Sequence, residues 1–305
     1  MTTNKNSEKT KQKLDSKLEI SKSIKTGNKK TNSVGFDNSF AFLPYVCCGD
    51  PSAEFTIKLV TTLVKNGADA IELGIPFSDP IADGKTIQAA SNRSLVNGMT
   101  PKKAMRVAVQ IRKDGIKVPI FIMTYYNIVY SNGLEQFVSE IKKSGANGLI
   151  VPDLPIDESE ELEKECKKQK IALVRFITPN TPVERLKKII KKAEEFADIE
   201  ANFIYAVSVL GTTGTRNKIA PEAIELIKKV KKMTSVPVVA GFGISTPEQA
   251  KEFADVGANG IIVGSRIVEL YSDGMENRRD EAKLLENVAR FTRRVTNLYK
   301  CPKSK

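Results

Sequence analysis

The sequence predicts a (β/α)8 barrel, also called a TIM barrel, of the α/β class, formed as one domain by residues 36–300. From residue 40 onward, short apolar runs alternate with longer amphipathic stretches rich in lysine and glutamate, a pattern typical of repeated βα units. Eight such units can be counted, and recurring turns join them. Their combined length fits the roughly 250 residues of such barrels. An open doubly wound sheet is the structural alternative.

The strands are expected at the apolar runs, taken in chain order. These runs are residues 40–48, 68–75, 118–125, 148–153, 172–178, 202–209, 236–244 and 260–265. Pro119 and Pro237 open the third and seventh strands, where the missing N–H is tolerated.

The helices are expected at the amphipathic stretches that follow each strand. They are residues 54–66, 101–114, 133–144, 158–169, 182–194, 220–232, 246–256 and 276–298. Gly67, Gly145 and Gly257 each open a Gly-Ala-Asp or Gly-Ala-Asn turn into the next strand. Glycine at such a position ends a helix. The segment 76–101 has no helix in this prediction and is longer than usual βα loops, which marks it as functional.

The amino-terminal segment differs in composition from the rest of the chain. Nine lysines against three acids within residues 1–31 supply half of the net charge of +12. Residues 1–35 are therefore predicted to be a disordered tail, with a second short tail at 301–305. We favour a solvated tail over one that contacts nucleic acid or an acidic partner. A transit peptide fits less well, because this segment has no arginine and three acids.

Composition also limits the class of protein. No run approaches the roughly 18 apolar residues of a membrane helix, and no signal-peptide core precedes residue 40. Cys47 and Cys48 are adjacent, but the chain has no Cys-x-x-Cys pair and no histidine. We therefore expect a cytoplasmic protein without a zinc site or other metal.

Two carboxylates stand where a strand ends and its loop begins. Glu72 interrupts the apolar run 70–75, and Asp83 follows in the next loop. Without histidine, acids are the natural groups for proton transfer. A buried, unpaired carboxyl holds its proton to higher pH, which suits a proton donor near neutrality. A structural acid satisfied by backbone amides or a lysine is the alternative.

Glycines after the last strands predict a phosphate site. Gly214, Gly243, Gly264 and Ser265 follow or end strands six, seven and eight, where barrels often bind phosphate with backbone amides. No role is assigned to Lys85 or Arg266. An apolar slot beside this site is expected from residues near other strand ends, although each could instead be core packing. These residues are Tyr45, Met123, Tyr125, Ile150 and Tyr205.

Motifs over about residues 36–300, in the same order and at compatible spacing, closely resemble the α-subunit of tryptophan synthase. They are ELGIPFSDPIADG at 72–84, Pro44-Tyr45, Gly49-Asp50-Pro51, Thr213-Gly214, GFGIS at 241–245 and Gly264-Ser265. The resemblance implies a lyase that cleaves indole-3-glycerol phosphate by a retro-aldol reaction. Its products are indole and glyceraldehyde 3-phosphate, formed without a metal or cofactor in this chain. The basic tail departs from the family pattern.

The resemblance also implies roles for residues and a partner. Glu72 corresponds to the general acid/base and Asp83 to the acid that engages the indole nitrogen. Thr213 would help close the site, and the loop 76–84 would face a β-subunit that carries pyridoxal phosphate and receives indole. An α2β2 complex follows by the same resemblance. Neither a membrane nor nucleic acid is expected as a partner.

Two other functions remain alternatives. One is another phosphate-binding barrel of aromatic amino-acid synthesis, such as an indole-glycerol-phosphate synthase or an isomerase, whose strand-end lysines and acids would differ. The other is a non-catalytic binding protein that activates a partner, which loss of Glu72 or Asp83 would indicate. Both acids are present.

Overall fold

The computed structural model describes residues 40–207, 219–241, 243–276 and 280–300. Both predicted tails, 1–35 and 301–305, lie outside these residues, as do Thr213 and Gly214. No helix in the described part of the chain is long and apolar enough to cross a membrane.

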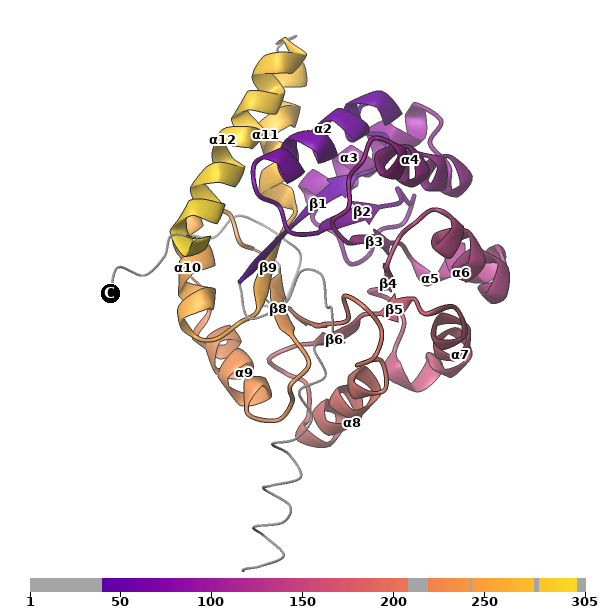
Figure 1. The fold of residues 1–305 in the computed structure, drawn as a ribbon, viewed down its shortest axis with the longest axis vertical. Coiled ribbons are helices and arrows are strands. Elements are labelled where there is room, and N and C mark those ends of the chain that lie inside the picture. The colour runs from indigo at the N-terminus through magenta and orange to yellow at the C-terminus, as the bar shows by residue number, and fades with distance from the viewer. Residues whose placement is uncertain (1–39, 208–218, 242, 277–279, 301–305) are drawn as a thin grey trace, which may run out of the picture. The chain divides into compact units, whose positions relative to one another are not determined.

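The described strands form one parallel sheet that curves into a barrel (Figure 1). They are β1 (Ala41–Cys47), β2 (Ile71–Gly74), β3 (Ile120–Met123), β4 (Gly148–Ile150), β5 (Ala172–Leu173), β6 (Arg175–Ile177), β7 (Ile204–Val207), β8 (Val238–Gly241) and β9 (Gly260–Val263). Their order is β5-β4-β3-β2-β1-β9-β8-β7-β6. The predicted barrel is confirmed, and the alternative of an open doubly wound sheet is wrong.

The predicted fifth strand is divided into β5 and β6 at Val174. The amide of Val174 still donates to the carbonyl of Leu149, at 3.0 Å. β5 pairs with β4, and β6 pairs with β7, so the two halves of this strand join the ends of the sheet. Eight predicted strands thus account for all nine described ones.

Helices surround the sheet in the expected alternation (Figure 1). They are α2 (Ala53–Lys65), α3 (Lys85–Val96), α4 (Pro101–Lys113), α5 (Tyr126–Ser131), α6 (Leu134–Lys143), the 3-10 helix η1 (Ile156–Glu158), α7 (Glu160–Gln169), α8 (Val183–Glu194), α9 (Pro221–Lys231), α10 (Pro247–Asp255), α11 (Ser265–Glu276) and α12 (Glu281–Lys300). The side chains of Ser52, Thr100 and Thr246 accept amide hydrogen bonds and so begin α2, α4 and α10.

Three α-helices were missing from the sequence prediction, namely α3, α5 and α11. The segment 76–101 was expected to be one long loop, but residues 85–96 within it form α3. This helix buries Ile87, Ala90, Ser91 and Ser94, most of them small or polar. Such a face gives little hydrophobic periodicity, which is why the pattern did not reveal it. The predicted helix 276–298 corresponds to α12, and α11 precedes it.

One buried polar cluster lies between the sheet and the helices. Glu163 of α7 contacts Arg175 of β6 and Lys192 of α8, with both N···O distances at 2.8 Å. The hydroxyl of Ser159 also donates to the carboxylate of Glu163, at 2.6 Å. We call these four residues the Glu163 cluster.

Candidate active site

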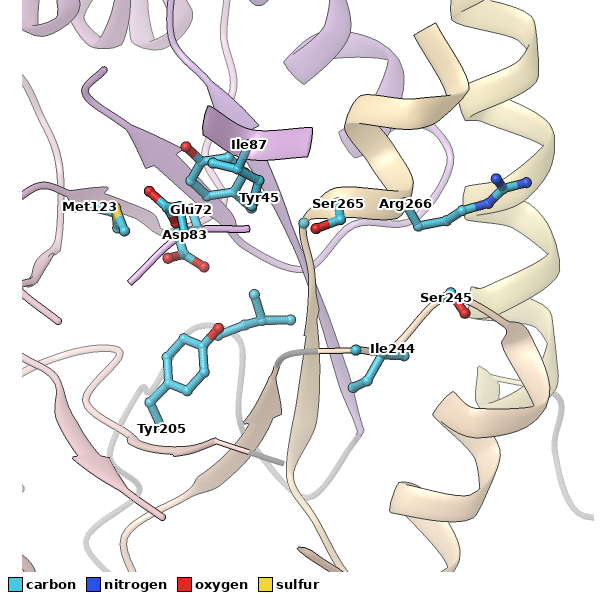
Figure 2. Close-up of a pocket in the computed structure, with 13 residues that line it drawn as sticks. Tyr45, Glu72, Asp83, Ile87, Met123, Tyr205, Ile244, Ser245, Ser265 and Arg266 are labelled. Atoms are coloured by element: carbon cyan, nitrogen blue, oxygen red, sulfur yellow. The ribbon is translucent and has the colours of Figure 1, made fainter. Parts of the chain in front are cut away.

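A cavity lies at the carboxyl ends of the strands, the position that barrels use for active sites (Figure 2). Its empty volume is about 560 Å³, which includes open solvent at its mouth. The lining comes from five strands, α3, α11 and the segments after β2, β8 and β9. The residues are Tyr45, Glu72, Asp83, Ile87, Met123, Tyr205, Gly243, Ile244, Ser245, Ile262, Gly264, Ser265 and Arg266.

Glu72 lies in the middle of the sheet, on β2 between β1 and β3. Its side chain lines the cavity rather than the helix layer, and the residue is only 4% exposed. The Oε2 atom has no hydrogen-bond partner among the described residues. Burial, and then the nearby charge of Asp83, raise the pKa of Glu72 to about 8. At neutral pH this carboxyl is therefore mostly protonated.

Asp83 ends the loop that follows β2, immediately before α3. Its Oδ2 atom accepts a hydrogen bond from the hydroxyl of Tyr125, at 2.9 Å. The amide of Ala82 in turn donates to the hydroxyl oxygen of Tyr125, at 3.1 Å. Burial raises the pKa of Asp83 to about 6, although the bond from Tyr125 opposes this shift. Asp83 is therefore mostly ionised at pH 7, beside a protonated Glu72.

Two tyrosines that line the cavity each place their ring over a glycine of a neighbouring strand. A Cβ atom on Gly74 would lie 2.3 Å from the hydroxyl oxygen of Tyr45, and one on Gly241 would lie 2.3 Å from that of Tyr205. No side chain could stand at either glycine unless a ring moved. Phe176 stacks on Tyr205, with ring centroids 4.8 Å apart. The two phenol rings thus fill the space that a side chain at Gly74 or Gly241 would take.

The opposite end of the cavity is formed by backbone. Gly243 has a φ of +76°, and Gly264 leads directly into α11 at Ser265. The first amides of a helix lack partners within that helix and favour an anion. At the neighbouring helix α10, the side chain of Gln249 accepts from the amides of Ser245 and Thr246. No described side chain accepts a hydrogen bond from the amides of Ser265 and Arg266, so the first amides of α11 are the freer of the two sets.

Most of the predicted site residues meet in this one cavity. Tyr45, Glu72, Asp83, Met123, Tyr205, Gly243, Gly264 and Ser265 all line it. Tyr125 is 1% exposed and does not line the cavity. Its hydroxyl instead donates to the carboxylate of Asp83, which does. Ile150 does not line it either. Thr213 and Gly214 lie outside the described residues, so their roles stay predictions.

Several lining residues were not predicted. Ile87 was missed because α3 was missed, whereas Ile244 and Ser245 stood inside a motif that had been noted only for its glycines. Ile262 belongs to β9 and gave no signal beyond an apolar run. Arg266, which had no assigned role, lines the cavity, but its guanidinium group points away from the two acids (Figure 2).

Comparison with known proteins places this geometry in a family. The family model described as tryptophan synthase alpha chain matches residues 32–297. A tryptophan synthase alpha chain of Methanocaldococcus jannaschii is 44% identical over 246 residues, which cover 80% of this chain and 84% of that protein. One from Arabidopsis thaliana is 39% identical over 252 residues, covering 80% and 89%.

Solved structures agree with the sequence relatives. A crystal structure of the tryptophan synthase complex from Pyrococcus furiosus has a TM-score of 0.74 and 34% identity, covering 86% of this chain and 98% of that one. A structure of the α2β2 complex from the same organism has a TM-score of 0.75 and 36% identity, covering 85% and 98%. The chain therefore belongs to the tryptophan synthase alpha chain family.

Proposed function

We propose that this chain is a carbon–carbon lyase of tryptophan biosynthesis that cleaves indole-3-glycerol phosphate to indole and glyceraldehyde 3-phosphate. One observation carries the proposal. Two buried acids, with pKa values of about 8 and about 6, share one cavity with the start of helix α11. A proton donor, an anionic stabiliser and an anion site are the three parts that this reaction needs.

The substrate would lie across the cavity with its phosphate at the glycine-lined end. Gly243, Gly264 and Ser265 would bind the phosphate through backbone amides and the start of α11, with Gly214 completing the site. The indole ring would pack between the rings of Tyr45 and Tyr205, near Met123. Binding energy from the remote phosphate would then hold the reacting carbon against the acids.

Cleavage begins when the carboxyl proton of Glu72 moves to carbon 3 of the indole. A carboxyl with a pKa near 8 is still protonated at neutral pH and can donate there. Protonation converts the ring to an indolenine cation, which weakens the bond between carbon 3 and the glycerol chain. The raised pKa of Glu72 is therefore part of the mechanism rather than only a consequence of burial.

Asp83 stabilises the positive charge that this step creates. The charge lies on the ring nitrogen, whose N–H would donate to the ionised carboxylate of Asp83. The hydroxyl of Tyr125 occupies the Oδ2 atom of Asp83, which orients the carboxylate. Asp83 must be ionised for this role, and at pH 7 its pKa of about 6 leaves it so.

A base completes the reaction by removing the proton of the glycerol hydroxyl next to the breaking bond. The electron pair of that O–H bond forms the aldehyde, while the carbon–carbon pair returns to the indole ring. Glu72 is a carboxylate after the first step and can accept this proton. Burial raises the pKa of Tyr205 well above 10, so its phenol stays protonated and is a poor base. Glu72 or a water molecule is the better candidate.

The partner would be a tryptophan synthase β-subunit in an α2β2 complex, to which indole passes. Pyridoxal phosphate would belong to that subunit, and this chain would need no cofactor of its own. Ile81, in the loop 76–84 next to Asp83, is 76% exposed, and a partner surface would cover it. Binding at this loop would thus act directly on the segment that carries Asp83. We place the complex in the cytoplasm.

The test is incubation of the purified chain with indole-3-glycerol phosphate, with and without a β-subunit, followed by an assay for indole. We expect indole from the chain alone and a faster release with the partner. The Glu72→Gln variant is the matched control, since it keeps the shape of the protonated acid. Absence of indole in both conditions, or equal release by the variant, would contradict the proposal.

A further inference from the structure

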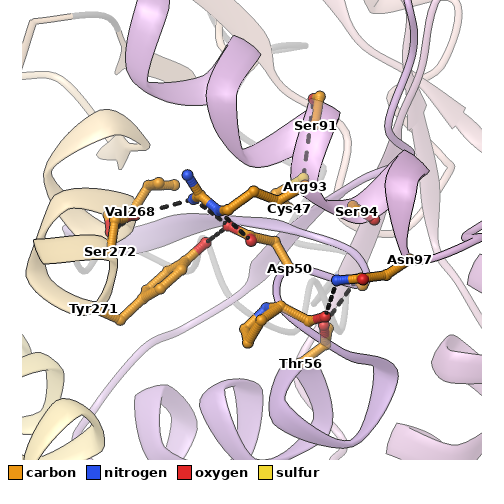
Figure 3. Close-up of polar contacts among 12 residues, drawn as sticks. Cys47, Asp50, Thr56, Ser91, Arg93, Ser94, Asn97, Val268, Tyr271 and Ser272 are labelled. Atoms are coloured by element: carbon orange, nitrogen blue, oxygen red, sulfur yellow. Dashed lines mark hydrogen bonds and ion pairs between the residues drawn. The ribbon is translucent and has the colours of Figure 1, made fainter. Parts of the chain in front are cut away.

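The turn between β1 and α2 holds a fully buried carboxylate outside the cavity (Figure 3). Asp50 accepts two hydrogen bonds from Arg93 of α3, from Nε to Oδ1 and from a terminal nitrogen to Oδ2, both at 2.8 Å. The hydroxyl of Tyr271 on α11 donates to Oδ2 of Asp50, at 2.9 Å. Arg93 also donates to Ser272 of α11, at 3.1 Å. We call these four residues the Asp50 clamp.

The same turn binds α3 at two further points. The hydroxyl of Ser94 donates to the carbonyl of Cys48, at 2.6 Å, and the amide of the Asn97 side chain donates to the carbonyl of Pro51, at 2.7 Å. A paired, bidentate contact between arginine and a carboxylate fixes orientation as well as distance. The carboxyl half of α3 is therefore fixed both to this turn and, through Asp50, to α11.

The two helices in the clamp both begin at the cavity. α3 begins at Lys85, two residues after Asp83, and α11 begins at Ser265, directly after Gly264. Their first turns also meet, since a Cβ atom on Gly264 would lie 3.2 Å from the Cδ1 atom of Ile87. Thus the helix that follows the predicted catalytic acid and the helix that starts at the predicted anion site meet at their first turns and are joined again through Asp50.

We propose that Asp50, with Arg93 and Tyr271, is a positioning device that sets the separation between Asp83 and the phosphate-binding start of α11. This inference rests on the proposed function, because a single substrate must then reach both groups at once. The clamp touches neither substrate nor reacting atoms. It acts through α3 and α11, because fixing these two helices to each other at the clamp also fixes the distance between their first residues at the cavity.

A change in this separation should affect turnover more than binding. The phosphate and the indole ring of the substrate can still each bind, but the reacting carbon is then displaced from Glu72 and Asp83. A misplacement of about 1 Å can cost about 100-fold in rate. A smaller shift should therefore lower kcat while leaving KM nearly unchanged.

The experiment compares Tyr271→Phe and Asp50→Asn with Thr292→Val in the full chain. Thr292 is a matched control because its buried hydroxyl on α12 donates to the carbonyl of Val288, at 2.9 Å; among the described residues it makes no hydrogen bond to the clamp, and it does not line the cavity. The readouts are kcat, KM, the midpoint of thermal unfolding and amide hydrogen exchange. The two decisive amides are those of Gln88 and Val268, which bond to the carbonyls of Gly84 and Gly264.

For Tyr271→Phe we expect kcat to fall about tenfold with KM changed by less than about threefold, as for an interaction realised in the transition state. Exchange at Gln88 and Val268 should quicken about tenfold, because both helix starts open locally more often. Asp50→Asn should lower kcat and quicken exchange at both amides by larger factors than Tyr271→Phe does. Thr292→Val should change neither kcat nor the exchange of these two amides, although it should lower the midpoint of thermal unfolding about as much as Tyr271→Phe does.

Unchanged exchange at both amides in the clamp variants, or equal acceleration in Thr292→Val, would overturn the proposal. An unchanged kcat in both clamp variants would overturn it as well. Failure of the unaltered chain to release indole would instead defeat the proposed function. The exchange measurement needs no turnover, so it still decides whether the clamp governs the two helix starts.

Discussion

Two glutamates of this barrel are equally buried but have opposite surroundings. Glu72 is 4% exposed and Glu163 is 2% exposed. Burial alone would raise the pKa of both. At Glu163, the bonds from Lys192 and Ser159 and the charge of Arg175 outweigh burial, and the pKa falls below its usual value. At Glu72, no described cation offsets burial, Asp83 adds a like charge, and the pKa rises to about 8.

The difference shows that burial of an acid does not by itself mark a catalytic group. A paired acid joins elements of the fold, as the Glu163 cluster joins β6 to α7 and α8, and losing one partner leaves the other charge buried. An acid that lacks a cation and lines a cavity keeps a proton that it can donate. Replacing each glutamate with glutamine should therefore have opposite consequences for activity and for stability.

The largest expected effect is on the activity of Glu72→Gln. Glutamine cannot donate a proton to carbon 3, so kcat should fall by about 1,000-fold or more, the upper range for general acids. Ligand binding should remain nearly intact, because glutamine resembles the protonated acid in shape. Steady-state kinetics with indole-3-glycerol phosphate, together with binding of glycerol 3-phosphate, would measure both. A variant that kept most of its turnover would remove Glu72 from the mechanism.

At Glu163, glutamine should harm stability instead. Glu163→Gln leaves Arg175, which is 6% exposed, without its anionic partner, and the expected loss is about 3 kcal/mol of unfolding free energy. Because the pKa of Glu163 is lowered by folding, the lost contribution is one that is present above the unfolded pKa and disappears as pH falls. Urea unfolding at pH 7 and pH 4 would test this. The Glu163→Gln protein that remains folded should keep the kcat of the unaltered chain.

Glu72→Gln should stabilise the fold. The folded protein keeps a proton on Glu72 that the unfolded chain releases above about pH 4.5, so stability declines as pH rises toward about 8. The substitution removes this penalty, by an amount on the order of 4 kcal/mol at pH 8 and almost nothing at pH 4. Thermal unfolding of both proteins across this range should diverge with rising pH. Parallel curves would show that Glu72 ionises normally.

The smallest expected effect concerns the acidic side of the pH–rate profile. Cleavage needs Glu72 protonated and Asp83 ionised, so kcat/KM should be bell-shaped with limbs near pH 6 and pH 8. Tyr125→Phe removes a hydrogen bond that lowers the pKa of Asp83. The acidic limb should then move to higher pH, with the basic limb nearly unchanged. A shift of the acidic limb to lower pH would contradict the role given to Tyr125.

Local sequence sufficed for the barrel and for both acids. The eight apolar runs have the length and spacing of parallel strands, and Glu72 stood out because it interrupts one of them. The glycines at 243 and 264 were likewise singled out by their place after strands, and both line the cavity. These features depend on residues that are near one another in the chain, so pattern alone can reveal them.

Contacts between distant segments could not be predicted in this way. The Asp50 clamp joins residues 50, 93, 271 and 272, and the Glu163 cluster joins α7, β6 and α8. α3 escaped notice because its buried face includes two serines, whose value comes from partners on the β1–α2 turn and β1. The role of Tyr125 beside Asp83 was also hidden, since 42 residues separate them.

The central claim is that Glu72 holds a proton at neutral pH, and carboxyl NMR measures this directly. The chain would be labelled with carbon-13 at the glutamate carboxyl, and the Glu72 signal would be assigned by its loss in Glu72→Gln. The account predicts a titration midpoint near pH 8. A midpoint near the ordinary value of 4.5 would contradict it.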